Sequence, residues 1–154
     1  RHFLDLARAE LARARRYQHP MALLMIDADH FKRINDSHGH QVGDQALRML
    51  SQTLRQTLRD VDIAGRLGGE EFAALLPETS QEGAISVAER LRRAVAKQSE
   101  VTERGGRFSL TVSIGVAVSN GHSEIEDLLR RADAALYRAK DLGRNRVEFM
   151  SHER

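Results

Sequence analysis

The sequence of 154 residues contains no cysteine, no tryptophan and only two prolines, and its apolar residues form no long run. Without cysteine, the chain forms neither a disulfide nor a thiolate metal site. The apolar segment Met21–Ile26 is much shorter than the roughly 18 residues that a membrane-spanning helix needs. We therefore expect no membrane contact by this domain.

Charge of one sign and aromatic residues are also scarce. The chain has 24 Lys and Arg residues against 22 Asp and Glu, so it has no overall positive field for a polynucleotide. Two tyrosines and five phenylalanines provide few of the stacking platforms that RNA-recognition sheets use. With 41% apolar and 30% charged residues, the composition indicates one globular domain that binds no nucleic-acid polymer.

The most informative motif is Arg66-Leu-Gly-Gly-Glu-Glu-Phe72. β-like segments flank the two glycines, and Gly-Gly supplies the positive φ angles that a tight hairpin turn needs. The carboxylates of Glu70 and Glu71 follow directly, and oxygen ligands on a rigid turn suit a hard cation such as Mg²⁺. Taken alone, such a motif is more often a solvated turn with exposed glutamates.

A second acidic motif, Asp27-Ala28-Asp29, ends the apolar segment. Side chains alternate along a strand, so Asp27 and Asp29 point to the same side, with Ala28 opposite. Acids at the end of a central strand, together with an acidic hairpin, are typical of sites where divalent ions assist phosphoryl or nucleotidyl transfer. A capping or turn role explains Asp27-x-Asp29 alone equally well, but the combination with Glu70 and Glu71 favours a metal site.

The polar segment 30–44, which we expect to be a loop or a short helix ending at Gly43, contains Asn35, His40 and Asp44. An amide and a carboxylate can satisfy the edge of guanine, because carboxylate oxygens accept from its N1–H and its exocyclic amine, and adenine lacks this pair of donors. Asn and Asp beside glycines are turn formers by default, so the spacing alone does not identify a base. His38 and His40 lack the further ligands of a zinc site.

These motifs, with others further along the chain, resemble the GGDEF domain of diguanylate cyclases in its GGEEF form. The resemblance runs nearly end to end and keeps the order of the family's motifs. The matching segments are Asp27-Ala-Asp-His-Phe-Lys-Arg-Ile-Asn-Asp36, Gly39-His40, Gly43-Asp44, Arg66–Phe72, Leu110-Thr-Val-Ser-Ile-Gly-Val-Ala117, Arg131-Ala-Asp-Ala-Ala-Leu-Tyr-Arg-Ala-Lys140 and Gly143-Arg-Asn-Arg146.

The resemblance implies a mixed α/β (α+β) fold, with a ferredoxin-like, palm-type sheet and flanking helices. The order of the apolar patterns agrees with it. We expect helices over residues 1–17, 44–58, 80–98 and 123–142, and strands over 21–27, 61–66, 71–77, 108–118 and 146–150. Such sheets serve polymerases, nucleotide cyclases and RNA-binding modules, so the fold alone does not identify a function.

The resemblance also implies a metal site and a set of catalytic residues. The side chains of Asp27 and Glu70 and the carbonyl group of Ala28 would hold Mg²⁺ or Mn²⁺, and Glu71 would bind a second ion or act as the base. Together with Lys32, the three acids are the residues expected to act in catalysis. Asp29, the second acid of the strand end, is expected to hold the following loop.

Each domain of this family would bind one GTP. The resemblance implies that Asn35 and Asp44 contact its base, with His40 nearby. The groups expected around the phosphates are His30, Phe31, Lys32, Lys140 and Arg144. Lys140 and Arg144 are four residues apart near the end of a helix, where cations are favoured in any case, so without the family a solvated helix end would explain them.

The segment Arg59-Asp-Val-Asp62 resembles the Arg-x-x-Asp inhibitory site that binds product in this family, and Arg90 matches a secondary contact. The planar fork of arginine suits phosphate and guanine recognition through paired hydrogen bonds. Arg-x-x-Asp also occurs often by chance in an arginine-rich chain.

The implied reaction condenses two GTP into cyclic di-GMP and pyrophosphate across a homodimer of GGDEF domains, with cyclic di-GMP as product and inhibitor. The family's Leu-Thr-Gly-Leu-x-Asn-Arg lead-in is absent or trimmed. We therefore expect residues 1–154 to be a single GGDEF domain taken from a longer, multidomain signalling protein of the bacterial cytoplasm, with a membrane anchor elsewhere in the full-length protein left open.

Two other functions compete with this one. A catalytically silent domain could act as a receptor or scaffold for GTP or cyclic di-GMP. Such members of the family usually lose acids of the hairpin or of the strand, whereas this chain retains Asp27, Glu70 and Glu71. A cyclase with a mononucleotide product would need a different set of residues to contact the base.

Overall fold

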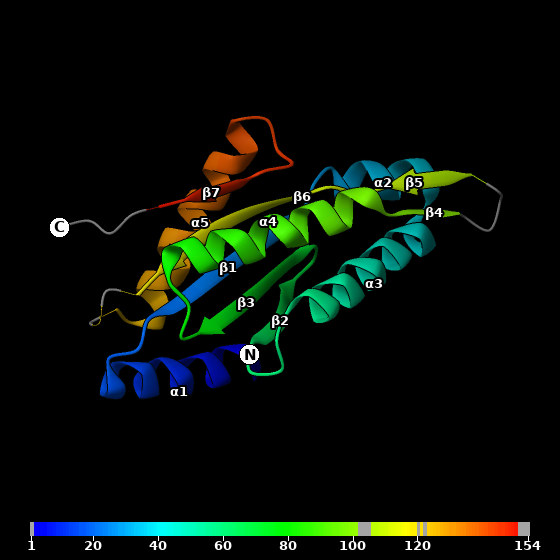
Figure 1. The fold of residues 1–154 in the computed structure, drawn as a ribbon. Coiled ribbons are helices and arrows are strands. Elements are labelled where there is room, and N and C mark those ends of the chain that lie inside the picture. The colour runs from blue at the N-terminus through cyan, green and yellow to red at the C-terminus, as the bar shows by residue number, and fades with distance from the viewer. Residues whose placement is uncertain (1, 102–105, 120, 122, 151–154) are drawn as a thin grey trace.

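The computed structural model describes residues 2–101, 106–119, 121 and 123–150, in which helices cover both faces of a five-stranded sheet (Figure 1). The helices are α1 (His2–Tyr17), α2 (Phe31–His38), α3 (His40–Thr57), α4 (Gln81–Lys97) and α5 (Ile125–Asp141). The strands are β1 (Met21–Ala28), β2 (Ile63–Gly68), β3 (Glu71–Pro77), β4 (Ser99–Val101), β5 (Arg107–Ser109), β6 (Val112–Val118) and β7 (Val147–Phe149). None of the helices in these described ranges is long and apolar enough to cross a bilayer.

Strand β1 lies at the centre of the sheet, whose order is β2-β3-β1-β6-β7. It pairs antiparallel with β3 and β6, while β6 and β7 pair in parallel. Strands β4 and β5 form a separate antiparallel ribbon. The order of β1, β2, β3 and β6 in chain and sheet gives the β-α-β-β-α-β core that the sequence predicted.

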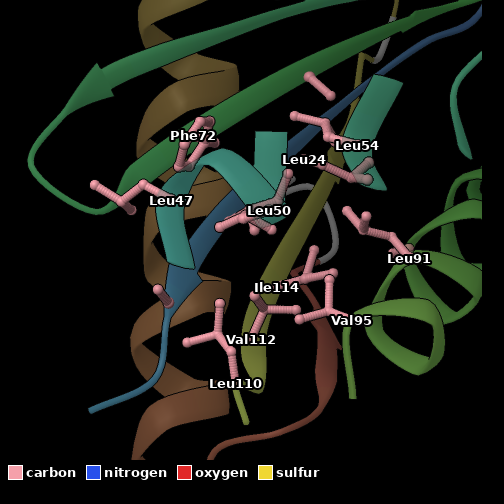
Figure 2. Close-up of a cluster of buried hydrophobic side chains, with 14 of the residues drawn as sticks. Leu24, Leu47, Leu50, Leu54, Phe72, Leu91, Val95, Leu110, Val112 and Ile114 are labelled. Carbon is pink, nitrogen blue, oxygen red and sulfur yellow. The ribbon is translucent and has the colours of Figure 1, made fainter. Parts of the chain in front are cut away.

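Alternation along β1 divides the hydrophobic core into two clusters. Leu24 and Ile26 pack with α3 and α4, where they meet Leu50 and Leu91 (Figure 2). Leu23 belongs to the second cluster, which α1 and α5 cover. Because β1 is buried on both faces, the acidic residues at its end lie on a rigid and poorly hydrated element.

Two boundaries differ from the prediction for identifiable reasons. Helix α3 begins at His40 rather than at residue 44, because Gly39, with φ of 87°, alone separates it from α2. Strand β2 begins at Ile63 rather than at residue 61, because Asp62 belongs to a turn that its hydrogen bonds with Arg59 close.

The single strand predicted over 108–118 is wrong in its extent. Two strands, β5 and β6, cover this range, and the chain breaks between them at Leu110 and Thr111. Strand β5 leaves the main sheet and pairs with β4, which the sequence did not predict. Both strands are three residues long, too short for alternation to reveal them. The break places the carbonyl group of Thr111 2.9 Å from the N–H of Asp29, at the acidic end of β1.

Candidate active site

Asp27 lies at the end of the central strand, and only 5% of its surface is exposed. Lys140 of α5 forms an ion pair with its Oδ2 atom. Its Oδ1 atom is buried and has no hydrogen-bond partner among the residues that the structure describes. A buried carboxylate oxygen without a partner is costly, so this atom is suited to receive a cation or a donor from a ligand.

The hairpin brings both glutamates to this strand end. In the β1–β3 pairing, Glu71 lies opposite Asp27. The N–H of Ala28 donates a hydrogen bond of 3.3 Å to the carbonyl group of Glu70. The four residues predicted to hold a metal therefore lie together, on the neighbouring strands β1 and β3 and on the turn that precedes β3.

The turn between β2 and β3 is braced in this position. Gly69 has φ of 47°, a left-handed conformation that glycine adopts without steric cost. The Nε atom of Arg66 donates a hydrogen bond of 2.8 Å to the carbonyl group of Gly69. The strand register also shifts between Arg66 and Gly68, as in a β-bulge. These features fix the backbone that carries the glutamates.

Around Asp27, the negative charges of Glu70 and Glu71 outnumber the positive charge of Lys140. Burial raises the pKa of Asp27 above its ordinary value of 3.8, Lys140 opposes this rise, and the charges of Glu70 and Glu71 add to it. Such a site favours a divalent cation. No three His, Asp or Glu side chains in the described part of the chain already form a metal-binding cluster. The residues fit a cation, but coordination requires the partly exposed glutamates to turn toward Asp27.

A close contact between helix and strand positions Lys140. A Cβ atom at Gly115 of β6 would lie 2.1 Å from the carbonyl oxygen of Ala132 and 2.3 Å from the backbone nitrogen of Leu136. Glycine therefore allows the backbone of α5 to lie directly on β6. Lys140 follows Leu136 by one helical turn, so this contact sets the distance from its side chain to Asp27.

Asp29 has a different environment from Asp27, because protein donors occupy both of its oxygens. The hydroxyl groups of Ser113 and Thr111 donate to Oδ1 and Oδ2 at 2.6 and 2.7 Å. The N–H of Asn145 also donates to Oδ2, at 3.0 Å. Asp29 thus holds the loops together, as the sequence predicted. Its partners Thr111 and Ser113 were missed, although small polar residues at alternating positions of a β segment were a usable signal.

The two residues predicted to contact a base come from neighbouring helices. Asn35 of α2 packs against Gly43 of α3, where a Cβ atom would lie only 1.8 Å from the Oδ1 atom of Asn35. That Oδ1 atom is buried and lacks a partner within the described residues. Asp44 follows Gly43, is exposed, and lines two hollows of about 410 and 810 Å³. Gly43 therefore allows Asn35 to pack directly against the turn of α3 that carries Asp44.

The remaining residues predicted around the nucleotide surround this region more loosely. His40 lines the larger hollow, and His30 precedes α2 with φ of 54°. Phe31 is partly buried, whereas Lys32 and Arg144 are exposed. Among the described residues, no hydrogen bond or ion pair joins Lys32 or Arg144 to the acidic strand end.

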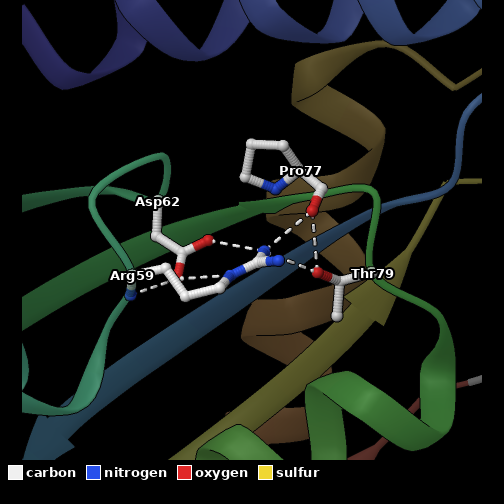
Figure 3. A network of polar contacts seen from close by, with 4 residues as sticks. All are labelled: Arg59, Asp62, Pro77 and Thr79. Atoms are coloured by element: carbon white, nitrogen blue, oxygen red, sulfur yellow. Dashed lines mark hydrogen bonds and ion pairs between the residues drawn. The ribbon is translucent and has the colours of Figure 1, made fainter.

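Arg59 and Asp62 close a turn before β2 (Figure 3). The Nη2 atom of Arg59 donates to Asp62, to the carbonyl group of Pro77 and to the hydroxyl group of Thr79, at 2.8, 2.8 and 3.0 Å. The Asp62 side chain is 1% exposed, but 53% of the Arg59 side chain remains accessible to a ligand. Arg90 is exposed on α4, and no hydrogen bond or ion pair within the described ranges links it to Arg59.

Comparison with known proteins identifies this arrangement. The family model "Diguanylate cyclase, GGDEF domain" matches residues 1–146. The chain belongs to the GGDEF family. It is 44% identical over 150 residues to diguanylate cyclase DosC of Escherichia coli K12, an alignment that covers 97% of this chain and 33% of DosC. The chain thus spans about a third of the length of the curated relatives that it matches.

Solved GGDEF domains have the same fold. The active GGEEF domain of a diguanylate cyclase from Vibrio cholerae superposes with a TM-score of 0.90 at 36% identity, over 99% of this chain and 96% of that one. The GGDEF domain of DgcB from Caulobacter crescentus, in complex with cyclic di-GMP, gives 0.91 at 33% identity, over 94% and 86% of the two chains. The palm-type fold expected from the sequence is confirmed.

Proposed function

We propose that this GGDEF domain is an active diguanylate cyclase that condenses two GTP into cyclic di-GMP, within a longer signalling protein of the bacterial cytoplasm. One observation supports this proposal above all. The buried carboxylate of Asp27 has one oxygen paired with Lys140 and one without a partner, next to Glu70 and Glu71. A domain that bound cyclic di-GMP alone, without a metal ion at this strand end, would leave this buried oxygen without a partner.

Asp27, Glu70 and the carbonyl group of Ala28 would hold Mg²⁺, or Mn²⁺ in its place, and Glu71 would bind a second ion or act as the base. When bound, the ion lowers the pKa of the attacking hydroxyl group and balances charge on the leaving pyrophosphate. Lys140 keeps Oδ2 of Asp27 in place and presents Oδ1 as a ligand atom.

Base selection rests on Asn35 and Asp44. The Asp44 carboxylate accepts hydrogen bonds from N1–H and the exocyclic amine of guanine, and the Asn35 amide adds a further polar contact. Adenine presents an acceptor at N1 and would leave the carboxylate unpaired, which costs affinity. His40 borders the same hollow.

The phosphates would lie between the start of α2 and the end of α5. The backbone N–H groups around His30, Phe31 and Lys32, at the N-terminus of α2, would donate hydrogen bonds to the phosphates. The side chains of Lys32, Lys140 and Arg144 neutralise it further. Lys32 belongs to α2, whereas Lys140 and Arg144 belong to α5 and to the loop directly after it, so these cations would reach the triphosphate from two sides.

In the reaction, the 3′-hydroxyl oxygen of one GTP forms a bond to the α-phosphorus of the other. The bond from that phosphorus to the bridging oxygen of the β-phosphate breaks, and pyrophosphate leaves. Glu71 accepts the hydroxyl proton. The reciprocal attack closes the ring and releases the second pyrophosphate. One domain holds one GTP, so two domains face each other across a two-fold axis.

Product inhibition is the second part of the proposal. Cyclic di-GMP would bind the accessible edge of Arg59, with Asp62 holding the guanidinium and Arg90 contributing a further contact. The ion pair with Asp62 raises the pKa of Arg59, so its charge is secure at every physiological pH.

The test is product analysis after incubation of the purified domain with Mg²⁺ and either GTP or ATP. We expect cyclic di-GMP and pyrophosphate in a 1:2 ratio from GTP, and no product from ATP. Tight GTP binding without turnover would instead identify a silent receptor, and a cyclic mononucleotide would identify a different cyclase.

A further inference from the structure

A chain of hydrogen bonds connects helix α4 to the loop that carries Arg144, and the two α4 residues in it, Glu89 and Arg92, have no part in the site described above. It begins with Glu89, whose two oxygens accept from Nε and Nη2 of Arg92 at 2.6 and 2.9 Å. The remaining nitrogen of the guanidinium, Nη1, donates to Oδ1 of Asn145 at 2.9 Å. Asn145 directly follows Arg144.

Asn145 satisfies three requirements at once. Its φ of 47° is left-handed, a conformation that asparagine tolerates better than most residues. Its N–H donates to Asp29, at 3.0 Å, and its side chain accepts from Arg92. The loop is therefore tied on one side to the acidic strand end and on the other to α4.

The loop needs such ties because its backbone is unfavourable. Gly143, Arg144 and Asn145 have consecutive φ values of 125°, 63° and 47°. Arginine gains nothing from a left-handed backbone, so the surrounding contacts must impose this conformation. Among the described hydrogen bonds, only the one from Arg92 connects α4 to this loop.

The paired hydrogen bonds to Glu89 hold the guanidinium group of Arg92 in a fixed orientation. Only 19% of the Arg92 side chain is exposed, and the paired hydrogen bonds lower the pKa of Glu89, so both groups are charged at neutral pH. The neighbouring Arg93 also contacts Glu89, at 3.4 Å, but its side chain is 65% exposed and it has no contact with the loop among the described residues.

We infer that Arg92, supported by Glu89 and acting through Asn145, is a positioning residue that holds Arg144 where it can bind the triphosphate of GTP. This role rests on the proposed function. It predicts that loss of Arg92 weakens GTP binding although Arg92 itself touches no nucleotide.

Calorimetry with GTP and Ca²⁺, an ion chosen to slow turnover, compares wild type with Arg92→Ala and Asn145→Gly. The glycine variant tolerates the left-handed backbone, keeps the N–H and removes the acceptor for Arg92. We expect GTP affinity to fall roughly tenfold in both, since displacement of a binding group by about 1 Å is enough for such a loss. Arg93→Ala, the matched control, should bind like wild type.

Combination with Arg144→Ala separates positioning from general destabilisation. If Arg92 acts through Arg144, Arg92→Ala costs no further affinity once Arg144→Ala has been introduced. Hydrogen exchange at residues 143–146 should also accelerate in Arg92→Ala and not in Arg93→Ala.

Additive losses in the double variant, or unchanged affinity in Arg92→Ala, would overturn this inference while leaving the cyclase proposal intact. A wild-type domain that binds no GTP would overturn the proposed function itself, and this role with it.

Discussion

Lys140 and Asp27 form an ion pair that uses only one oxygen of the carboxylate and leaves the other buried without a partner among the described residues. Two positions further on, Asp29 shows what a structural acid looks like in this fold, because protein donors occupy both of its oxygens. The contrast indicates that Asp27 is incomplete without a ligand. In our account that ligand is a divalent cation.

The first prediction follows from the pKa of Asp27. Burial raises this pKa, so the protonated form is favoured in the folded state. The stability contributed by this group is fully present below its ordinary pKa of 3.8 and is lost as the pH rises through the raised value. Asp27→Asn mimics the protonated form. We therefore expect a higher melting temperature than wild type at pH 7, with the difference vanishing in acid.

The control for this prediction is Asp29→Asn. An amide has a single acceptor oxygen and an NH₂ group that only donates, so it cannot accept from all three donors around Asp29, and this variant should be less stable than wild type at neutral pH by about 1–3 kcal/mol. If Asp27→Asn also proved less stable at pH 7, Asp27 would be a structural acid like Asp29.

The second prediction concerns the contact that positions Lys140. In Gly115→Ala, the new methyl group would lie 2.1 Å from the backbone of α5, which must move away from β6. We expect a loss of about 2–3 kcal/mol in the free energy of unfolding, and reduced cyclase activity. In chemical denaturation, Gly68→Ala should be nearly neutral, because nothing lies within 4 Å of a Cβ atom there. Equal stabilities of the two variants would contradict the close packing.

The third prediction concerns feedback. Arg59→Ala removes the paired guanidinium contacts but leaves the acidic strand end untouched. We expect at least tenfold weaker binding of cyclic di-GMP by calorimetry, a higher plateau of accumulated product and little change in the initial rate. Inhibition of the wild type should be non-competitive with GTP. Thr79→Val, which removes one of the hydrogen bonds to Arg59, should have a smaller effect. Equal affinity in wild type and Arg59→Ala would make the Arg-x-x-Asp match coincidental.

The fourth prediction concerns concentration. If two domains must meet to react, the specific activity of the isolated domain rises with protein concentration, and fusion to a strong dimeriser raises it further. Activity measured alongside light scattering provides the test. A constant specific activity from a protein that stays monomeric throughout would rule out a two-domain site.

The central strand, the acidic hairpin and the long helices could be predicted from sequence because each has a local signature. Met21–Ile26 is an uninterrupted apolar run, and the glycines before Glu70 mark the turn. The ribbon of β4 and β5 could not be predicted, because no local pattern shows that Phe108 pairs with Glu100 instead of continuing the main sheet.

The candidate site shows the same division. The sequence identifies acids such as Asp27, but pairing within the sheet decides that Glu71 lies opposite it. The hydrogen bond from Arg92 to Asn145 and the close packing of α5 on Gly115 join residues far apart in the chain. No local sequence pattern indicates such contacts. Glycine in a strand or arginine on a helix has many ordinary explanations until the packing is known.

The most direct test of the metal-dependent cyclase is the rate of cyclic di-GMP formation by wild type, Asp27→Asn and Glu70→Gln under matched Mg²⁺, followed by chromatography. Each substitution preserves shape while removing a charged ligand. We expect turnover by wild type and a loss of at least about 100-fold in both variants. Glu126→Gln, at an exposed ion pair with Arg8, should match wild type. Near-normal turnover by Asp27→Asn would contradict the account.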